Sequence, residues 1–156
     1  MTAIIDYQNV YEGEEEIANA IPSADSLTLW ANAVLSAEGL HEQEVTIRFT
    51  DETESQQLNS DYRQKNKPTN VLSFPFEAPP SIEINLLGDL VICAPVISRE
   101  ASEQKKAVEH HYAHMTVHGI LHLLGYDHIT EDEAYLMESK EIDILSKLGI
   151  TNPYEI

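Results

Sequence analysis

The feature that most constrains this chain is a short run in which three histidines surround a glycine. The spacing is His-x3-His-x2-Gly-x2-His, with histidines at positions 118, 122 and 128 and the glycine at position 125. Residues four apart on a helix lie on one face, about 6 Å apart along the axis, so His118 and His122 can direct their imidazoles at one point. Gly125 tolerates the left-handed backbone that ends a helix, and a turn there can bring His128 back over His122. The run therefore predicts a helix that ends in a glycine turn and gathers three imidazoles.

Three imidazoles leave one coordination position free, which is typical of catalytic rather than structural zinc. Structural zinc usually takes four protein ligands, most often with cysteine among them, and Cys93 is the only cysteine here. The same spacing occurs in the metzincin peptidases, whose general-base glutamate directly follows the first histidine, whereas this chain has Gly119 there. We expect one Zn2+ per chain on His118, His122 and His128, although imidazole also suits nickel and other borderline metals. The competing interpretation is a polar core in which the imidazoles only form hydrogen bonds.

Two neighbours of this motif are candidates for supporting roles. His114 lies one turn upstream of His118, and its azimuth drifts by about 40° from that of His118. It can contact substrate, support a metal ligand from behind, or simply pack. Asp127 can accept a hydrogen bond from a ligand imidazole, or it can cap the turn. The remaining histidines, at positions 41, 110 and 111, show no comparable pattern, and we expect them at the surface.

Hydrophobic periodicity predicts an α+β fold with α/β character, a single domain over residues 1–156. Its core is expected to be a mixed sheet of about four strands with helices around it. Apolar runs indicate strands at residues 3–10, 45–49, 71–74 and 86–93. Residues 77–85 contain two adjacent prolines and are expected to form a loop. The order of the strands does not follow from these patterns.

Apolar residues at helical spacing predict helices over residues 26–38, 95–124 and 130–148, the second as one long helix or two in succession. Asp51 with Glu54 has the spacing of a capping box and is expected to begin a further helix that runs towards Arg63. Thr130 with Glu133 repeats that signal before the last helix. The acidic residues 12–16 indicate a loop or the start of a helix.

The charge of the chain excludes a general affinity for polyanions. Nine lysines and arginines face 27 aspartates and glutamates, and the resulting net charge of −18 repels nucleic acid over most of the surface. Three of the nine cations, Arg63, Lys65 and Lys67, lie close together, so this stretch is the candidate substrate contact, with a solvated turn as the alternative. The lone Cys93, and the lack of a secretory leader or a membrane-length apolar run, favour a cytoplasmic protein without membrane contact.

Three motifs spread along the chain carry a family resemblance. They are Asn59–Pro75, Leu87–Ile92 and His118–His128, and together they resemble the bacterial endoribonuclease YbeY family of ribosomal RNA maturation factors. The resemblance implies a zinc-dependent endoribonuclease, selective for single-stranded RNA, that acts in ribosomal RNA processing and ribosome quality control. The processing step implied is notably maturation of the 3′ end of the small-subunit RNA. The implied partners are single-stranded and ribosomal RNA and the ribosome.

The resemblance also assigns individual residues. It places the metal ligands on the three histidines of the last motif and a functionally important arginine on Arg63. An arginine fork can stabilise the charge that develops on phosphoryl oxygens during cleavage. Asn70 stands where many members have aspartate, so we assign residue 70 no essential acid–base role.

Two other functions remain open at this point. A zinc hydrolase of amides or peptides would share the metal site, but no carboxylate next to His118 supplies its base. A non-catalytic ribosome-assembly factor would use zinc only to hold its fold. The sequence does not choose between hydroxide and the 2′-hydroxyl as the attacking group, and it does not predict an oligomeric state.

Overall fold

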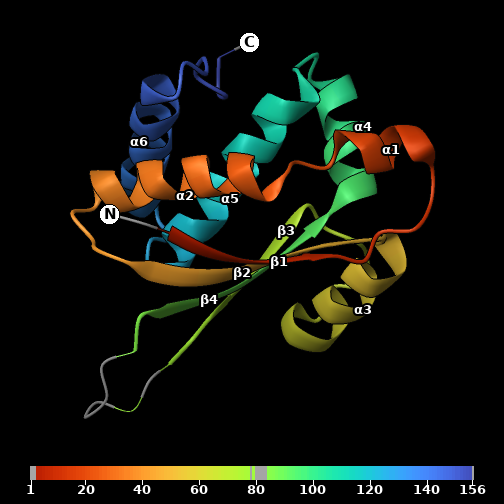
Figure 1. The fold of residues 1–156 in the computed structure, drawn as a ribbon, viewed down its shortest axis with the longest axis horizontal. Coiled ribbons are helices and arrows are strands. Elements are labelled where there is room, and N and C mark those ends of the chain that lie inside the picture. Colours follow the sequence, from red (N-terminus) through yellow and green to blue (C-terminus); the bar gives the residue numbers. More distant parts are fainter. Residues whose placement is uncertain (1–2, 78, 80–83, 156) are drawn as a thin grey trace.

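A four-stranded mixed sheet forms the centre of the fold (Figure 1). The computed structural model describes residues 3–77, 79 and 84–155. Within them the strands follow the order β1-β2-β4-β3 and comprise β1 (Ala3–Asn9), β2 (Gln43–Thr50), β3 (Val71–Pro75) and β4 (Leu86–Cys93). β1, β2 and β4 run parallel, whereas β3 pairs with β4 in the antiparallel direction at one edge. The predicted mixed sheet is confirmed, and residues 78 and 80–83 of the predicted loop lie outside the described residues.

Six helices pack around this sheet in the described part of the chain. They are α1 (Glu15–Ala20), α2 (Ala24–Ala37), α3 (Glu52–Arg63), α4 (Ala94–Glu103), α5 (Val108–Leu123) and α6 (Glu131–Lys147). The predicted helical stretch over residues 95–124 is two helices, because the chain turns between α4 and α5, where Lys105 adopts a φ of 55°. Together with the mixed sheet, these helices confirm the predicted α+β class. None of the helices is long and apolar enough to cross a membrane.

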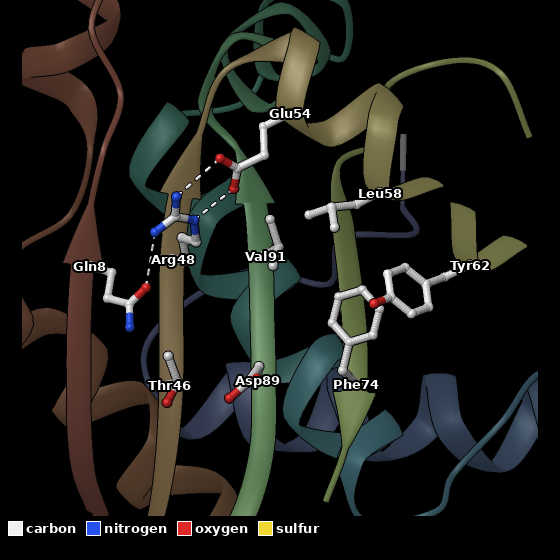
Figure 2. A pocket seen from close by; sticks show the side chains of 9 residues that line it. All are labelled: Gln8, Thr46, Arg48, Glu54, Leu58, Tyr62, Phe74, Asp89 and Val91. Carbon is white, nitrogen blue, oxygen red and sulfur yellow. Dashed lines mark hydrogen bonds and ion pairs between the residues drawn. The ribbon is translucent and has the colours of Figure 1, made fainter. Parts of the chain in front are cut away.

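The helices are distributed unequally over the two faces of the sheet. Figure 1 shows α2 and α5 with most other helices over one face, while α3 lies across the other. Side chains alternate accordingly along β4, since Leu90 is fully buried on the α5 side and Asp89 is exposed. On the α3 face, Arg48 of β2 forms a bidentate ion pair with Glu54, with Nε–Oε1 and Nη2–Oε2 distances of 2.6 and 3.0 Å (Figure 2). This pair joins α3 to the sheet.

The two capping signals in the sequence have different outcomes. The Thr130 hydroxyl accepts from the Glu133 backbone N–H, and the Glu133 side chain accepts from the Thr130 backbone N–H, so the capping box of α6 is confirmed. Asp51 caps α3 by accepting from the backbone N–H of Glu54 at 2.9 Å. The Glu54 side chain, however, turns to Arg48 rather than to the Asp51 backbone. The prediction of a complete capping box at Asp51 is therefore wrong, because an ion pair with β2 takes the carboxylate.

α5 is the central helix and is enclosed on nearly every side. It packs against α2, α4, α6, β3 and β4. From residue 111 to residue 123, every side chain is buried except those of His118 and His122. Gly119 permits a close approach to the sheet, since a Cβ built there would lie 2.8 Å from Cδ2 of Leu90. The missing side chain at residue 119 therefore sets how closely α5 can lie on β4.

We predict that Gly119→Ala destabilises the fold, although alanine has the higher helix propensity. A methyl group forced against the buried Leu90 side chain costs about 1–3 kcal/mol, whereas the gain in propensity returns only about 0.5–1 kcal/mol. Urea denaturation should therefore give a lower free energy of unfolding for the variant than for the wild type.

The matched control is the same substitution in a Leu90→Ala background, where space for the methyl group exists. There Gly119→Ala should cost less, or should stabilise the protein, because the two residues are coupled through direct contact. An equal cost in both backgrounds would show that contact with Leu90 is not the cause.

Candidate active site

The histidine motif lies where α5 is left partly open between residues 111 and 123. His118 and His122 are both partly exposed there. His111, which was expected at the surface, is only 2% exposed, and its Nε2 lies 2.8 Å from Oε1 of Glu100 on α4. That expectation is wrong because α4 packs on this part of α5 and supplies a carboxylate partner for the ring. The histidines at positions 41 and 110 are exposed, as expected.

A glycine turn reverses the chain after α5. Gly125 has a φ of 106°, a value that residues with side chains rarely adopt. Its N–H bonds to the carbonyl of His122 at 3.0 Å, and the Tyr126 N–H bonds to that of Leu121 at 3.1 Å, which together form a Schellman motif. The Tyr126 hydroxyl donates to Glu38 at 2.6 Å and ties the turn to the end of α2. The chain can then return its next histidine to α5.

The three histidines of the motif converge on one point. One ring nitrogen from each of His118, His122 and His128 lies within 4.8 Å of the other two. The ring centroids are 4.7 Å apart for residues 118 and 122, 5.0 Å for 122 and 128, and 5.7 Å for 118 and 128. Zinc–nitrogen bonds of about 2.0–2.1 Å in a tetrahedral site place the nitrogens about 3.3 Å apart, a difference that small side-chain rotations can close. These residues could therefore hold a metal ion.

The electrostatics of the cluster suit a metal ligand. Burial lowers the pKa of His122, and the neighbouring His118 and His128 lower it further. A neutral imidazole is the form that binds a metal, so a lowered pKa keeps the ligand available at neutral pH. The donor set of three imidazoles thus fits zinc or a similar borderline metal.

A buried carboxylate lies behind the histidines and was missed in the sequence. Glu141 of α6 is fully buried, with Oε2 at 2.8 Å from Nδ1 of His118 and Oε1 at 2.6 Å from Nε2 of His114. Burial alone raises the pKa of Glu141, but hydrogen bonds with His114 and His118 outweigh that effect and lower the pKa to about 2. The group is therefore an anion at neutral pH.

One signal in the sequence could have revealed this carboxylate. The buried residues of α6 are Met137, Glu141, Ile144 and Leu145, which together form one stripe at helical spacing. A single acid on an otherwise apolar stripe indicates a buried partner. No local pattern, however, says that the partner is a histidine on α5.

The two supporting residues take different positions. His114 is 6% exposed and contacts Glu141. Burial lowers its pKa, although the hydrogen bond with Glu141 opposes this effect. Asp127 accepts the backbone N–H of His128 at 2.8 Å, whereas its distance to the ring Nδ1 of His128 is 4.0 Å. Asp127 therefore caps the turn, and no hydrogen bond joins it to the ring.

Arg63 and the histidine cluster line one cavity, which has a volume of about 770 Å³. Arg63, the last residue of α3, lines this cavity together with all three histidines and Asp127. Asn70 lines it too and donates its amide Nδ2 to a Glu100 oxygen at 3.2 Å. The other two cations of the predicted contact are exposed and follow α3, outside the lining, at positions 65 and 67.

This fold and this site define a small α+β protein with an open three-histidine centre of hydrolase type. Residues 11–149 match the family model described as Endoribonuclease YbeY. A protein from Alteromonas mediterranea named endoribonuclease YbeY is 75% identical over 155 residues, which are 99% of this chain and 98% of that protein. The chain therefore belongs to the endoribonuclease YbeY family, and the family and enzyme class expected from the sequence motifs are confirmed.

A solved structure shares the fold at much lower sequence identity. The solution structure of TM1509 from Thermotoga maritima matches with a TM-score of 0.55 at 20% identity, covering 96% of each chain. This likeness concerns the fold alone.

We predict about one metal ion per chain in purified protein, and loss of that ion in His118→Ala, His122→Ala and His128→Ala. Each substitution removes one of only three protein ligands. Elemental analysis measures the content directly. Chelation should also lower the melting temperature of the wild type, because an ion that binds only the folded state stabilises it.

His110→Ala is the matched control, since His110 lies on α5 but is exposed and outside the cluster. It should retain the ion. Full metal content in the His128→Ala protein would show that the third ligand lies elsewhere.

Proposed function

We propose that this protein is a zinc-dependent endoribonuclease that cleaves single-stranded RNA in cytoplasmic ribosomal RNA processing, notably at the 3′ end of the small-subunit RNA. Membership of the family supports RNA as the substrate, and we extend the proposal to the ribosome and its quality control. The observation that carries the proposal is a single cavity lined both by Arg63 and by the three histidines. Phosphodiester cleavage needs a cation near the phosphoryl oxygens and a centre that activates the nucleophile.

Arg63 is the residue proposed to bind the scissile phosphate. Its guanidinium can donate two parallel hydrogen bonds to the nonbridging oxygens, which fixes the phosphate and stabilises the charge that develops on it. Arg63 is exposed and forms no ion pair with any carboxylate in the described part of the chain. Its donors are therefore available to a substrate.

The three histidines are proposed to hold the zinc ion in the cavity that this arginine also lines. A zinc ion there supplies Lewis acidity, which polarises a phosphoryl oxygen or makes water a better nucleophile. The histidines themselves set where that Lewis acid lies relative to the phosphate bound by Arg63. Attack by water and attack by the RNA 2′-hydroxyl leave these residue roles unchanged.

Two aromatic side chains in the lining favour a single-stranded substrate. Tyr62 and Phe74 both line the cavity, their ring centroids are 5.1 Å apart, and Tyr62 is 64% exposed. An unpaired base can stack on such a ring, and each stacked base contributes about 1–3 kcal/mol to binding. A duplex keeps its bases stacked inside and cannot use this surface.

The distribution of cations supports a local phosphate contact in an acidic protein. Four cations are paired with carboxylates, namely Arg48, Arg99, Lys140 and Lys147. Arg63, Lys65 and Lys67, by contrast, form no ion pair with any described residue. Lys105 and Lys106 also form no ion pair with any described residue but lie outside the cavity lining, so Arg63 is the one unpaired cation in that lining.

The packing of α5 argues against peptide hydrolysis by the metzincin route. In that route the residue after the first histidine is the general base. Gly119 instead faces Leu90 of β4, so a longer side chain there would enter the core rather than the cavity. Cleavage of amides would therefore need a base from another element.

We predict that Arg63→Ala cleaves single-stranded ribosomal RNA fragments at least about 100-fold more slowly than the wild type, the usual cost of losing one donor to a developing oxyanion. Zinc content and melting temperature should stay close to wild-type values, because the side chain is exposed and unpaired. Cleavage is measured on RNA labelled at one end, with casein as a parallel substrate for the peptidase alternative.

Arg99→Ala is the control, since Arg99 is an exposed arginine paired with Glu52 outside the cavity. It should cleave RNA normally. Normal cleavage by Arg63→Ala would remove the assigned role from Arg63.

We also predict that RNA binding weakens steeply with salt. About three phosphate contacts on single-stranded RNA give a slope of about −2 in a plot of log binding constant against log salt concentration. Arg63→Ala should reduce the slope by about 0.7, the contribution of one contact. Fluorescence anisotropy with labelled RNA at several salt concentrations measures both slopes, and a salt-independent binding constant would contradict the cationic contact.

A further inference from the structure

A hydrogen-bond network centred on a buried carboxylate joins the C-terminal segment to the metal-binding face of α5. Its centre is the fully buried Glu141 carboxylate. Oε2 faces Nδ1 of His118 at 2.8 Å. Oε1 faces Nε2 of His114 at 2.6 Å and accepts the Tyr154 hydroxyl at 2.5 Å. Both carboxylate oxygens are thus engaged, and the three partners come from two separate segments.

This geometry determines which nitrogen of His118 carries a hydrogen. A carboxylate only accepts hydrogen bonds, so the ring nitrogen facing it must donate. Nδ1 of His118 therefore holds the hydrogen and Nε2 keeps its lone pair. In metal sites, a carboxylate behind a histidine ligand sets the ring tautomer and orientation in this way.

The chain after α6 is folded so that Tyr154 reaches the same carboxylate. The Ile150 N–H bonds back to the Leu145 carbonyl at 2.9 Å, and Ile150 packs against the core. Asn152 Oδ1 then accepts the Tyr154 backbone N–H at 2.8 Å. The Tyr154 ring stands edge-on to His114, with centroids 5.3 Å apart. Tyr154 is thus held in place by its own segment and by the network.

We infer that Glu141 and Tyr154 are positioning residues, which hold His118 in the tautomer and orientation that present Nε2 to a metal ion. A buried carboxylate is stable only when donors satisfy it, and without the Tyr154 hydroxyl Oε1 would keep a single donor. The last residues of the chain therefore contribute to the metal centre without contacting it. This inference rests on the metal-centre part of the proposed function.

The test compares Tyr154→Phe and Glu141→Gln in the full-length chain, before and after zinc addition. Long-range 1H–15N correlation spectra report which ring nitrogen of His118 is protonated, and competition with a chromophoric chelator gives the zinc dissociation constant. Tyr135→Phe is the matched control for the hydroxyl, because Tyr135 lies on α6 but is 76% exposed. Glu109→Gln, at an exposed position in the first turn of α5, is the control for the carboxylate.

In the wild type, His118 should carry its hydrogen on Nδ1 both with and without zinc. Glu141→Gln should mix the two tautomers, because the amide oxygen can accept from only one histidine while the amide NH2 group donates to the other. It should also raise the zinc dissociation constant about 10–100-fold. Tyr154→Phe should perturb the same signals and raise the constant by a smaller factor, since His114 still donates to Oε1. The two control variants should match the wild type.

The results that would overturn the inference are equally specific. An unchanged His118 tautomer and unchanged zinc affinity in both variants, even with a lower melting temperature, would reduce the network to a purely structural role. An effect of Glu141→Gln alone would remove Tyr154 from it. A wild-type protein without zinc affinity would instead refute the metal centre itself.

Discussion

The packing of α5 on β4 is the contact on which the rest of the structure depends. Gly119 brings the helix so close to the sheet that Leu90 occupies the space where a side chain would stand. Because α2, α4 and α6 also pack against α5, only His118 and His122 stay partly exposed between residues 111 and 123, and they form one open strip. The contact that builds the core therefore also decides which side chains of this helix can reach a ligand.

Charge is arranged around that strip from two sides. Behind the rings, the buried Glu141 anion faces Nδ1 of His118 and leaves the other ring nitrogen free. Arg63 lines the same cavity as the histidines and is exposed and unpaired within the described part of the chain. The site thus has one buried carboxylate behind His118 and one unpaired cation, Arg63, in the cavity lining, together with the Asp127 carboxylate. This order of charges suits a centre that binds a metal and then an anionic substrate.

Predictions from local patterns held where no distant residue competes for the same side chain, and they failed where one does. The turn at Gly125 and the Thr130 capping box involve residues within a few positions of one another. His111 was placed at the surface from its local pattern, yet a carboxylate from α4 buries it. Glu54 was expected to close a cap, yet a β2 arginine bonds to it instead. In each failure a partner from another element outcompeted the local one.

The sequence by itself determined the helix, the glycine turn and the return of His128, because helical periodicity and the left-handed freedom of Gly125 are local properties of the backbone. It also determined the family, through motifs whose order along the chain is preserved. Only the tertiary structure decided the strand order, the place of Arg63 in the histidine cavity and the burial of Glu141 behind it. These depend on which faces of separate elements pack together, and no spacing within one element encodes that choice.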